Sequence, residues 1–403
     1  MSAGRCIVLV MDSLGIGAAP DAAGYGDDGA DTLGHIVAET RDLRLPVLAG
    51  LGLARAAEAA RGQPLAHDIG DVNDNAAWAH ALPVGRPKGS TGGHWEIAGL
   101  PVHEDWGYFG RDSADPYPAG LLEALAGQAG IDGVITVGRA SGTAVIAEHG
   151  EAHVQSGRPI VYTSADSVLQ IAAHERVFGL ARLYAVCEAA RTLCDAYRIA
   201  RVIARPFVGE GAGDFRRTDN RRDFAMPPSA ATLLDRLQAH GVPVITFGKI
   251  GDLFAHRGID TQHPATGQEQ VFDALADTLA NRPEPGFLFA NFCDFDSKYG
   301  HRRDVAGYAG ELVAFDARLG RFLAELSPND RLIITADHGN DPTAPGSDHT
   351  RECVPVLLHG AGVSPGNHGR RDGFADVGAT VAAFFDLPAT GLTGRPITYE
   401  TDS

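Results

Sequence analysis

Cys6-Ile-Val-Leu-Val-Met-Asp12 is a run of six apolar residues that ends in an acid. A short, continuous apolar run of this kind is typical of a strand that is buried on both faces, as in a parallel sheet. The acid then falls where the strand stops. Because open α/β sheets bind ligands at the carboxyl ends of their strands, Asp12 is predicted to lie at a binding edge.

Four further apolar runs follow the same pattern in the second half of the chain, at residues 242–247, 286–292, 331–336 and 354–358. Stretches with helical periodicity lie around them, at residues 229–240, 268–280, 305–326 and 374–385. Strands and helices in alternation predict a doubly wound α/β core with a mostly parallel sheet. Asp296 and Asp337 also fall just beyond apolar runs, so the sequence places them at the same edge as Asp12.

The middle of the chain, from residue 102 to residue 228, has a different pattern. Its strand-like runs, at 134–137, 160–163 and 201–205, accompany a helical stretch at 178–196 and many short loops. We therefore predict an inserted α+β cap domain over 102–228, between two parts of the core, 1–101 and 229–403. A chain of 403 residues is long enough for such an arrangement.

Composition argues against several classes of function. The formal net charge is -17 and no long basic run offsets it, so nucleic-acid binding is not expected. No apolar segment approaches the roughly 20 residues that span a bilayer, and the first residues lack the features of a signal peptide. The five cysteines sit mostly in apolar runs and are interpreted as free thiols of a cytoplasmic protein. The oligomeric state stays open, and a monomer is compatible with the sequence.

Carboxylates and imidazoles recur together near the ends of the predicted strands, as Asp337-His338, Asp348-His349 and the pair Asp296 and His301. Acidic oxygens and imidazoles in this ratio suit a pair of divalent ions, and two such ions can activate a hydroxyl for phosphoryl transfer. Each segment alone has another explanation, because Asp and His are also common in turns. Their repetition at several strand ends favours a metal site.

Five longer tracts resemble the signature segments of the bacterial phosphopentomutases, at residues 11–17, 93–99, 162–170, 294–308 and 336–351. The resemblance extends from about residue 6 to residue 396. It implies an alkaline-phosphatase-like core fold with an inserted cap. It also implies two Mn²⁺ ions per chain, in whose place other divalent ions could serve, and a sugar bisphosphate as primer.

The resemblance assigns six metal ligands by position. Asp12, Asp337 and His338 would hold one ion, and Asp296, His301 and His349 would hold the other. Asp294 lies two residues before a ligand on the same strand, and it is interpreted as an outer residue that orients the ligands.

The nucleophile segment, Lys88-Gly-Ser-Thr-Gly-Gly-His-Trp-Glu96, departs from the family pattern. The family usually has Lys-Asp-Thr, two further residues and Gly-His-Trp-Glu, with the threonine phosphorylated. Alignment without a gap places Ser90 on that threonine, whereas a loop shifted by one residue would present Thr91. Two cations can activate either hydroxyl, so the sequence favours Ser90 and leaves Thr91 open.

Three further residues match positions with which the family holds the sugar hydroxyls and the distal phosphate: Asp166, Arg205 and Lys249. The arginine-rich run at 216–223 either adds to this phosphate site or forms a solvated surface. The resemblance implies that the substrates are sugar phosphates. Ribose 1-phosphate and ribose 5-phosphate, and likewise the 2-deoxyribose pair, would interconvert through a phosphoenzyme and a pentose bisphosphate. The alternatives are a cofactor-independent phosphoglycerate mutase, a metal-dependent phosphomonoesterase and an inactive metal-binding protein.

Overall fold

The computed structural model describes residues 4–110, 116–164, 167–211, 213–281, 285–388 and 391–397. Contacts within it divide the chain into two compact units. The core unit comprises Met1–Glu104 and Pro228–Ser403, and the cap unit comprises Asp105–Pro227. The sequence predicted the cap over residues 102–228.

Within these residues, the core unit is built on an eight-stranded sheet with the order β10-β9-β11-β1-β12-β13-β2-β14. Its strands are β1 (Arg5–Met11), β2 (Ala77–Ala81), β9 (Val244–Phe247), β10 (Thr261–His263), β11 (Gly286–Phe292), β12 (Arg331–Thr335), β13 (Val354–Gly360) and β14 (Gly366–Arg371). The strands from β10 to β12 are mutually parallel, whereas β13 runs antiparallel to both of its neighbours. The predicted α/β core with a mostly parallel sheet is confirmed.

Strand β1 lies inside this sheet, between β11 and β12. All seven of its residues are buried, as expected for a continuous apolar run. Cys6 pairs with Phe287 of β11 on one side and with Arg331 of β12 on the other. Parallel pairing brings the carboxyl ends of the three strands to one edge, so the residues that follow these strands converge.

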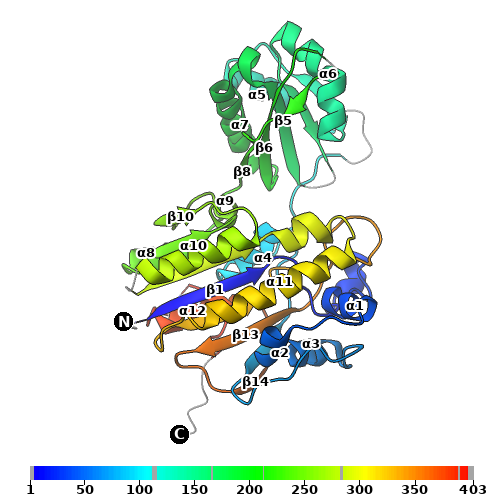
Figure 1. Cartoon of the computed structure of the whole chain (residues 1–403). Coiled ribbons are helices and arrows are strands. Elements are labelled where there is room, and N and C mark those ends of the chain that lie inside the picture. The colour runs from blue at the N-terminus through cyan, green and yellow to red at the C-terminus, as the bar shows by residue number, and fades with distance from the viewer. Residues whose placement is uncertain are drawn as a thin grey trace. The chain divides into compact units, whose positions relative to one another are not determined.

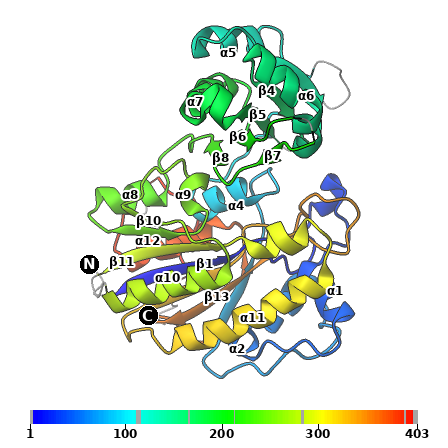
Figure 2. The same ribbon diagram turned by 45° about the horizontal axis from the view of Figure 1, so that its top comes forward.

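Helices cover both faces of the core sheet (Figures 1 and 2). They are α1 (Thr32–Glu39), α2 (Pro46–Gly50), α3 (Leu53–Arg61), α4 (Ser90–Ile97), α8 (Leu233–Ala239), α9 (Ile250–Leu253), α10 (Gln268–Asn281), α11 (Val305–Leu323) and α12 (Ala375–Phe384), with the short turns η1 (Ala22–Tyr25) and η3 (Phe295–Gly300). Helices α10 and α11 lie across one face, and α12 packs with α4 and α8 on the other. The helix predicted at 229–240 begins only at Leu233, because Thr232 and Asp235 form a capping box there.

The cap unit has a sheet of its own, with the order β3-β4-β5-β6-β7 and with β8 paired to β6. Its strands are β3 (Ile135–Arg139), β4 (Ile160–Thr163), β5 (Val168–His174), β6 (Arg201–Val208), β7 (Arg216–Arg217) and β8 (Arg222–Ala225). Its helices are α5 (Leu121–Ala129), α6 (Gly142–Ser156), α7 (Leu180–Asp195) and the π-helical turn η2 (Glu175–Gly179). Parallel and antiparallel pairs are mixed, since β4 is parallel to β3 and antiparallel to β5.

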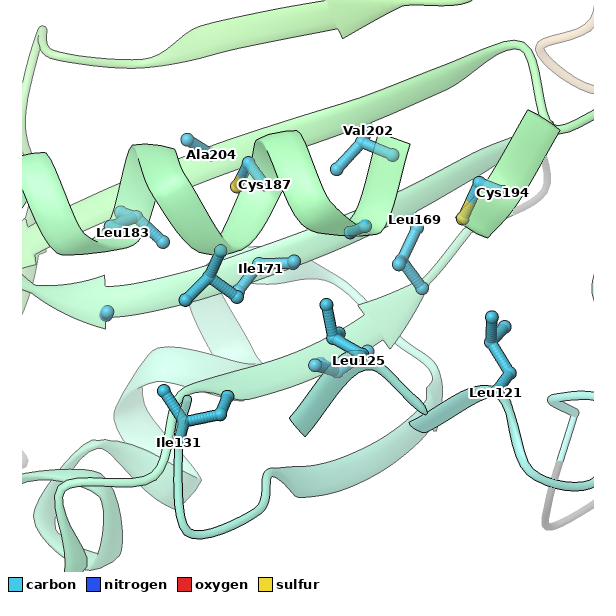
Figure 3. Close-up of a cluster of buried hydrophobic side chains, with 14 of the residues drawn as sticks. Leu121, Leu125, Ile131, Leu169, Ile171, Leu183, Cys187, Cys194, Val202 and Ala204 are labelled. Carbon is cyan, nitrogen blue, oxygen red and sulfur yellow. The ribbon is translucent and has the colours of Figure 1, made fainter. Parts of the chain in front are cut away.

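A hydrophobic cluster fills one face of the cap sheet (Figure 3). Leu183 and Cys187 of α7 and Leu125 of α5 belong to it, together with Leu169 and Ile171 of β5. Helix α6 packs on the opposite face in a second cluster that includes alternate residues of the same strands. The cap unit therefore has a hydrophobic core that is separate from that of the core unit.

The cysteines in both units are free thiols, and all but Cys293 are buried. Burial raises the pKa of the Cys6 and Cys194 thiols to about 12, so neither ionises near neutral pH. In the part of the chain that the structure describes, no helix combines the length and the apolar character needed to cross a bilayer.

A buried ion pair ties the start of β1 to the start of β12. Arg5 donates from Nε to Asp330 Oδ1 at 3.0 Å and from Nη2 to Asp330 Oδ2 at 2.6 Å. We expect Asp330→Ala to lower the free energy of unfolding by about 3–5 kcal/mol, because it removes the carboxylate that is paired with a buried guanidinium. Asp372→Ala, which breaks an exposed pair with Arg370, should lower it by less than about 1 kcal/mol. Urea unfolding measures both values, and equal effects would contradict this account.

The contribution of Asp330 should also depend on pH. Burial alone would raise the pKa of Asp330, but hydrogen bonds from Arg5 lower it below its ordinary value. The pair therefore stabilises the fold fully above the unfolded pKa of about 3.9, and this stabilisation is lost as the pH falls through the folded pKa. The difference between wild type and Asp330→Ala should shrink below about pH 4.

Candidate metal centre

Three acids converge at the carboxyl edge of the core sheet. Asp12 follows β1 directly, Asp296 lies just past β11, and Asp337 lies just past β12. Their side chains are buried, and Asp12 and Asp337 are each only 1% exposed. The parallel order β11-β1-β12 accounts for their meeting, because these strands end side by side.

The antiparallel part of the sheet brings further segments to the same edge. Because β13 runs antiparallel to β12, its start rather than its end lies here, and His349 precedes that start. Strand β2 runs antiparallel to β13, so it ends at this edge, and the segment that leads to Ser90 follows it. Strand direction therefore explains how residues from both ends of the chain reach one site.

The possible metal-ligating atoms form two groups that share Asp296. In the first group, Asp296 Oδ2 lies 3.1 Å from His301 Nε2, and Asp296 Oδ1 lies 3.5 Å from His349 Nε2. In the second group, Asp12 Oδ1 lies 3.3 Å from His338 Nε2, and the ligand atoms of these two residues and Asp296 all lie within 4.8 Å of one another. Each group offers three donor atoms to one ion.

Asp337 lies beside these two groups. The sequence predicted that it would share an ion with Asp12 and His338, whereas the second group contains Asp296 in its place. Asp337 Oδ2 lies 3.4 Å from His338 Nε2, and Asp337 Oδ1 accepts a hydrogen bond from the Ser13 N–H. The role of Asp337 as a ligand stays a prediction.

Backbone carbonyls orient the imidazoles of both groups. His301 Nδ1 lies 2.8 Å from the carbonyl oxygen of Ser347, and His338 Nδ1 lies 3.0 Å from that of Gly339. His349 Nδ1 lies 2.7 Å from the carbonyl oxygen of Lys88. Since a carbonyl oxygen can only accept a hydrogen bond, each Nδ1 must carry the hydrogen, and each Nε2 can offer its lone pair. The three Nε2 atoms all lie close to Asp296 or Asp12, which is the orientation that metal-binding histidines need.

The charges at this edge favour a bound cation. Burial would lower the pKa of His338, but the carboxylates of Asp337 and Asp12 raise it to about 10. Burial would raise the pKa of Asp296, but His349 and His301 hold it well below the ordinary range of a carboxyl group. Buried carboxylates need compensating positive charge, which a divalent ion supplies.

Two polar atoms at the site also fit a metal ion. Among the described residues, Asp337 Oδ2 and His349 Nε2 are buried without a hydrogen-bond partner. His94 Nδ1 lies 3.0 Å from Asp337 Oδ2, but its hydrogen is used by the Ser90 carbonyl at 2.8 Å. An unsatisfied buried polar atom costs about 1–3 kcal/mol, and coordination of an ion would offset that cost. The donor set of acids and imidazoles therefore fits divalent metal ions.

Ser90 is the first residue of α4, and its hydroxyl faces the second group. Ser90 Oγ lies 3.4 Å from Asp12 Oδ1 and 3.4 Å from His338 Nε2. Thr91, the alternative nucleophile, follows it in the helix and is only 9% exposed. The first turn of a helix leaves backbone N–H groups without partners inside the helix, and such groups bind phosphate well.

Close packing explains Gly93 of α4 and Gly89, which directly precedes the helix. A Cβ on Gly93 would lie 2.0 Å from the carbonyl oxygen of Asp337, so a larger residue would push α4 away from the acids. A Cβ on Gly89 would lie 3.0 Å from His349 Nδ1, an unusually short contact. The helix that carries Ser90 is thus seated directly against two of the segments that supply possible ligands.

Comparison with known proteins agrees with this site. Residues 4–389 match the Metalloenzyme superfamily. A phosphopentomutase of Methylobacterium nodulans is 53% identical over 401 residues, which cover 95% of this chain and 98% of that protein. A phosphopentomutase of Methylorubrum extorquens is 51% identical over 399 residues, which cover 96% and 98%. This chain belongs to the phosphopentomutase family.

Membership of the phosphopentomutase family confirms the resemblance that the five sequence tracts indicated. Among solved structures, a phosphoglycerate mutase of Leishmania mexicana matches with a TM-score of 0.51, covering 99% of this chain and 98% of that one. Its sequence identity is only 14%, so the match shows a shared fold and carries no information on the substrate.

The other predicted residues of this phosphopentomutase-family chain lie in different places. Lys249 follows β9 in the core unit and is half-buried. Asp166 lies outside the described residues. Asp294 accepts hydrogen bonds from Lys298 Nζ at 2.8 Å and from the Gln268 N–H at 3.3 Å, so it links the turn η3 to the start of α10.

Arg205 lies on β6 of the cap unit, and its Nε donates to Gln170 Oε1 at 2.9 Å. Burial, together with the like charges of Arg221 and Arg217, lowers the pKa of Arg205. The arginine-rich run at 216–223 therefore contributes guanidinium groups near Arg205. Like charges held together in this way favour an anionic ligand.

Sequence reasoning missed two asparagines that orient the acids. Asn291 Nδ2 donates to Asp12 Oδ2 at 3.0 Å, and Asn340 Nδ2 donates to Asp296 Oδ1 at 2.6 Å. Asn291 had a detectable signal, since it is a polar residue inside the apolar run of β11. Asn340 had none beyond its place two residues after His338.

Proposed function

We propose that this chain interconverts ribose 1-phosphate and ribose 5-phosphate, and likewise the 2-deoxyribose pair. The observation that carries the proposal is the position of Ser90 Oγ, 3.4 Å from Asp12 and from His338, in a chain of the phosphopentomutase family. A hydroxyl beside buried acids, at the start of a helix, is well placed to carry a phosphoryl group.

The site would hold two divalent ions, which we propose to be Mn²⁺. The residues proposed to hold them are Asp12, Asp337 and His338 for one ion and Asp296, His301 and His349 for the other, and Asp296 is close enough to serve both. When bound, the ions supply positive charge that lowers the pKa of the Ser90 hydroxyl and offsets the negative charge on the transferring phosphoryl group. The chain itself contributes fixed imidazoles and the backbone N–H groups of the first turn of α4.

In the proposed cycle, phosphorylated Ser90 gives its phosphoryl group to the free hydroxyl of a pentose monophosphate. The bond from Ser90 Oγ to phosphorus breaks, a bond from the sugar oxygen to phosphorus forms, and the sugar's hydroxyl proton passes to Ser90 Oγ. The pentose bisphosphate then reverses its orientation. The same step in reverse, with the other phosphate, restores phosphorylated Ser90 and releases the isomeric monophosphate. A sugar bisphosphate can therefore act as primer.

We assign the phosphate that is not reacting to Arg205 and Lys249, and the sugar hydroxyls to Asp166. A guanidinium binds phosphate oxygens through two parallel N–H groups, and an ammonium binds them as a point charge. The positive surroundings of Arg205 support its part in this assignment.

Arg205→Ala and Lys249→Ala should each raise the KM for ribose 1-phosphate. Loss of a hydrogen bond to a charged group costs about 1.5–3 kcal/mol, which corresponds to a change of roughly 10- to 150-fold. Steady-state kinetics provide the measurement. Arg182→Ala is the matched control, because Arg182 is an exposed arginine of α7 that packs over the Phe178 ring. If the KM of both test variants equals that of the control, the assignment is wrong.

A substrate panel tests the proposed function. The purified, Mn²⁺-loaded protein is primed with a sugar bisphosphate and given ribose 1-phosphate, 2-deoxyribose 1-phosphate or 3-phosphoglycerate. We expect both pentose phosphates to isomerise, with no turnover of phosphoglycerate and little release of inorganic phosphate. Isomerisation of phosphoglycerate alone would make the chain a phosphoglycerate mutase. Inorganic phosphate as the main product would make it a phosphomonoesterase.

A further inference from the structure

Arg303 is a half-buried loop residue whose side chain makes many hydrogen bonds. Its guanidinium donates to five acceptors: Gly346 O at 2.8 Å, Asp348 O at 2.8 Å, Asp341 O at 2.9 Å, Gly300 O at 3.2 Å and Asn340 Oδ1. Four of these acceptors are backbone carbonyls. The backbone of Arg303 has a φ of 56°, a left-handed conformation that costs energy for a residue other than glycine.

The acceptors of Arg303 belong to the segments that carry the possible metal ligands. Gly300 directly precedes His301, and Asp348 directly precedes His349. The third segment, with Asn340 and its neighbour, follows His338. One guanidinium thus joins the turn before His301 to two nearby stretches of the segment from His338 to His349, and it does so beside the site without belonging to either ligand group.

The hydrogen bond to Asn340 connects Arg303 to Asp296, the acid that both ligand groups share. A guanidinium can only donate hydrogen bonds, so the Asn340 oxygen must face Arg303. The amide nitrogen of Asn340 is then turned the other way, where it donates to Asp296 Oδ1 at 2.6 Å. Asn340 is completely buried, so its amide has no solvent with which to exchange these partners.

We propose that Arg303, acting through Asn340, is the positioning residue that sets the orientation of Asp296 and thereby the affinity of both metal sites. This inference rests on the metal centre of the proposed function. Because Asp296 belongs to both ligand groups, a change in its orientation affects both ions at once. Arg303 touches neither substrate nor metal in this account.

Arg303→Lys is the primary test, since lysine keeps the charge but its single ammonium cannot reach acceptors in three segments. Mn²⁺ binding to the metal-free full chain is measured by calorimetry and by electron paramagnetic resonance of the bound ions. The affinity of both sites should fall together by about 10- to 100-fold, the usual effect of losing an outer partner of a metal ligand. Arg302→Lys, at the exposed neighbouring arginine, is the matched control and should bind Mn²⁺ as the wild type does.

Asn340→Leu separates positioning from general stability. It removes the contact with Asp296 but leaves the four carbonyl bonds of Arg303 in place. It should reproduce the loss of Mn²⁺ affinity, and the thermal unfolding temperature of its metal-free form should fall less than that of Arg303→Lys. Wild-type affinity in both variants, or weakening of one site only, would overturn the inference. Failure of the wild type to bind Mn²⁺ would instead contradict the proposed metal centre.

Discussion

Ser90→Ala should lose mutase activity while it still binds both metal ions. The alanine has no oxygen to carry the phosphoryl group, and removal of a catalytic nucleophile costs up to about 10⁶-fold in kcat, so we expect a loss of at least ~10⁴-fold. Metal binding should persist because the acids and imidazoles near Ser90 remain. Kinetic assays, together with calorimetric titration of Mn²⁺, measure the two properties separately.

Thr91→Val is the control for Ser90→Ala and should keep most of the activity. After incubation with a sugar bisphosphate, peptide mass mapping should find the phosphate on Ser90. Phosphate on Thr91, with an active Ser90→Ala variant, would move the nucleophile by one residue and leave the remaining assignments unchanged. An active enzyme with phosphate on neither hydroxyl would overturn the phosphoenzyme cycle.

Removal of divalent ions should abolish activity, and Mn²⁺ should restore it. The Ser90 hydroxyl lies 3.4 Å from the buried carboxylate of Asp12, whose negative charge opposes the approach of an anionic phosphate unless cations offset it. Dialysis against a chelator, metal analysis and assays before and after addition of Mn²⁺ provide the measurement. Full activity in protein shown to contain no metal would contradict the two-ion site.

His349→Ala should resemble partial removal of metal, because it takes one ligand from the first group and leaves the second group complete. Mn²⁺ should bind more weakly at one site, and the activity at limiting Mn²⁺ should fall. His256→Ala serves as its control. His256 is exposed, forms a hydrogen bond with Gln262 and belongs to neither ligand group. Equal Mn²⁺ affinities in the two variants would show that His349 is not a metal ligand.

Much of the core could be predicted because its central strands carry a clear sequence signal. Strands β1, β11 and β12 are continuous apolar runs, so the sequence located them and the acids that follow them. Strand β2 is a short segment with an internal histidine, and β14 is a largely polar edge strand, so neither has an apolar pattern to detect. The reversed direction of β13 could not be predicted, because strand direction depends on how the connections cross the sheet.

The sequence predicted which residues form the site better than it predicted how they are arranged. Strand ends placed Asp12, Asp296 and Asp337 at one edge, but they did not show that Asp296 is shared by two groups of ligands. Asp296 lies in the π-helical turn η3 and accepts a hydrogen bond from the amide of Asn340. Such contacts join segments that are far apart in the sequence, so no local sequence pattern predicts them.

The central place of β1 determines when the protein can assemble during synthesis. The ribosome releases β1 early, but its two neighbours in the sheet begin only at Gly286 and Arg331. Until those segments have been translated, the apolar side chains of β1 stay without their native partners and are open to aggregation with other nascent chains. Neither ligand group is complete before His338 has been made. Under the proposed assignment of the ligands, the metal sites would therefore form only after most of the chain has been translated.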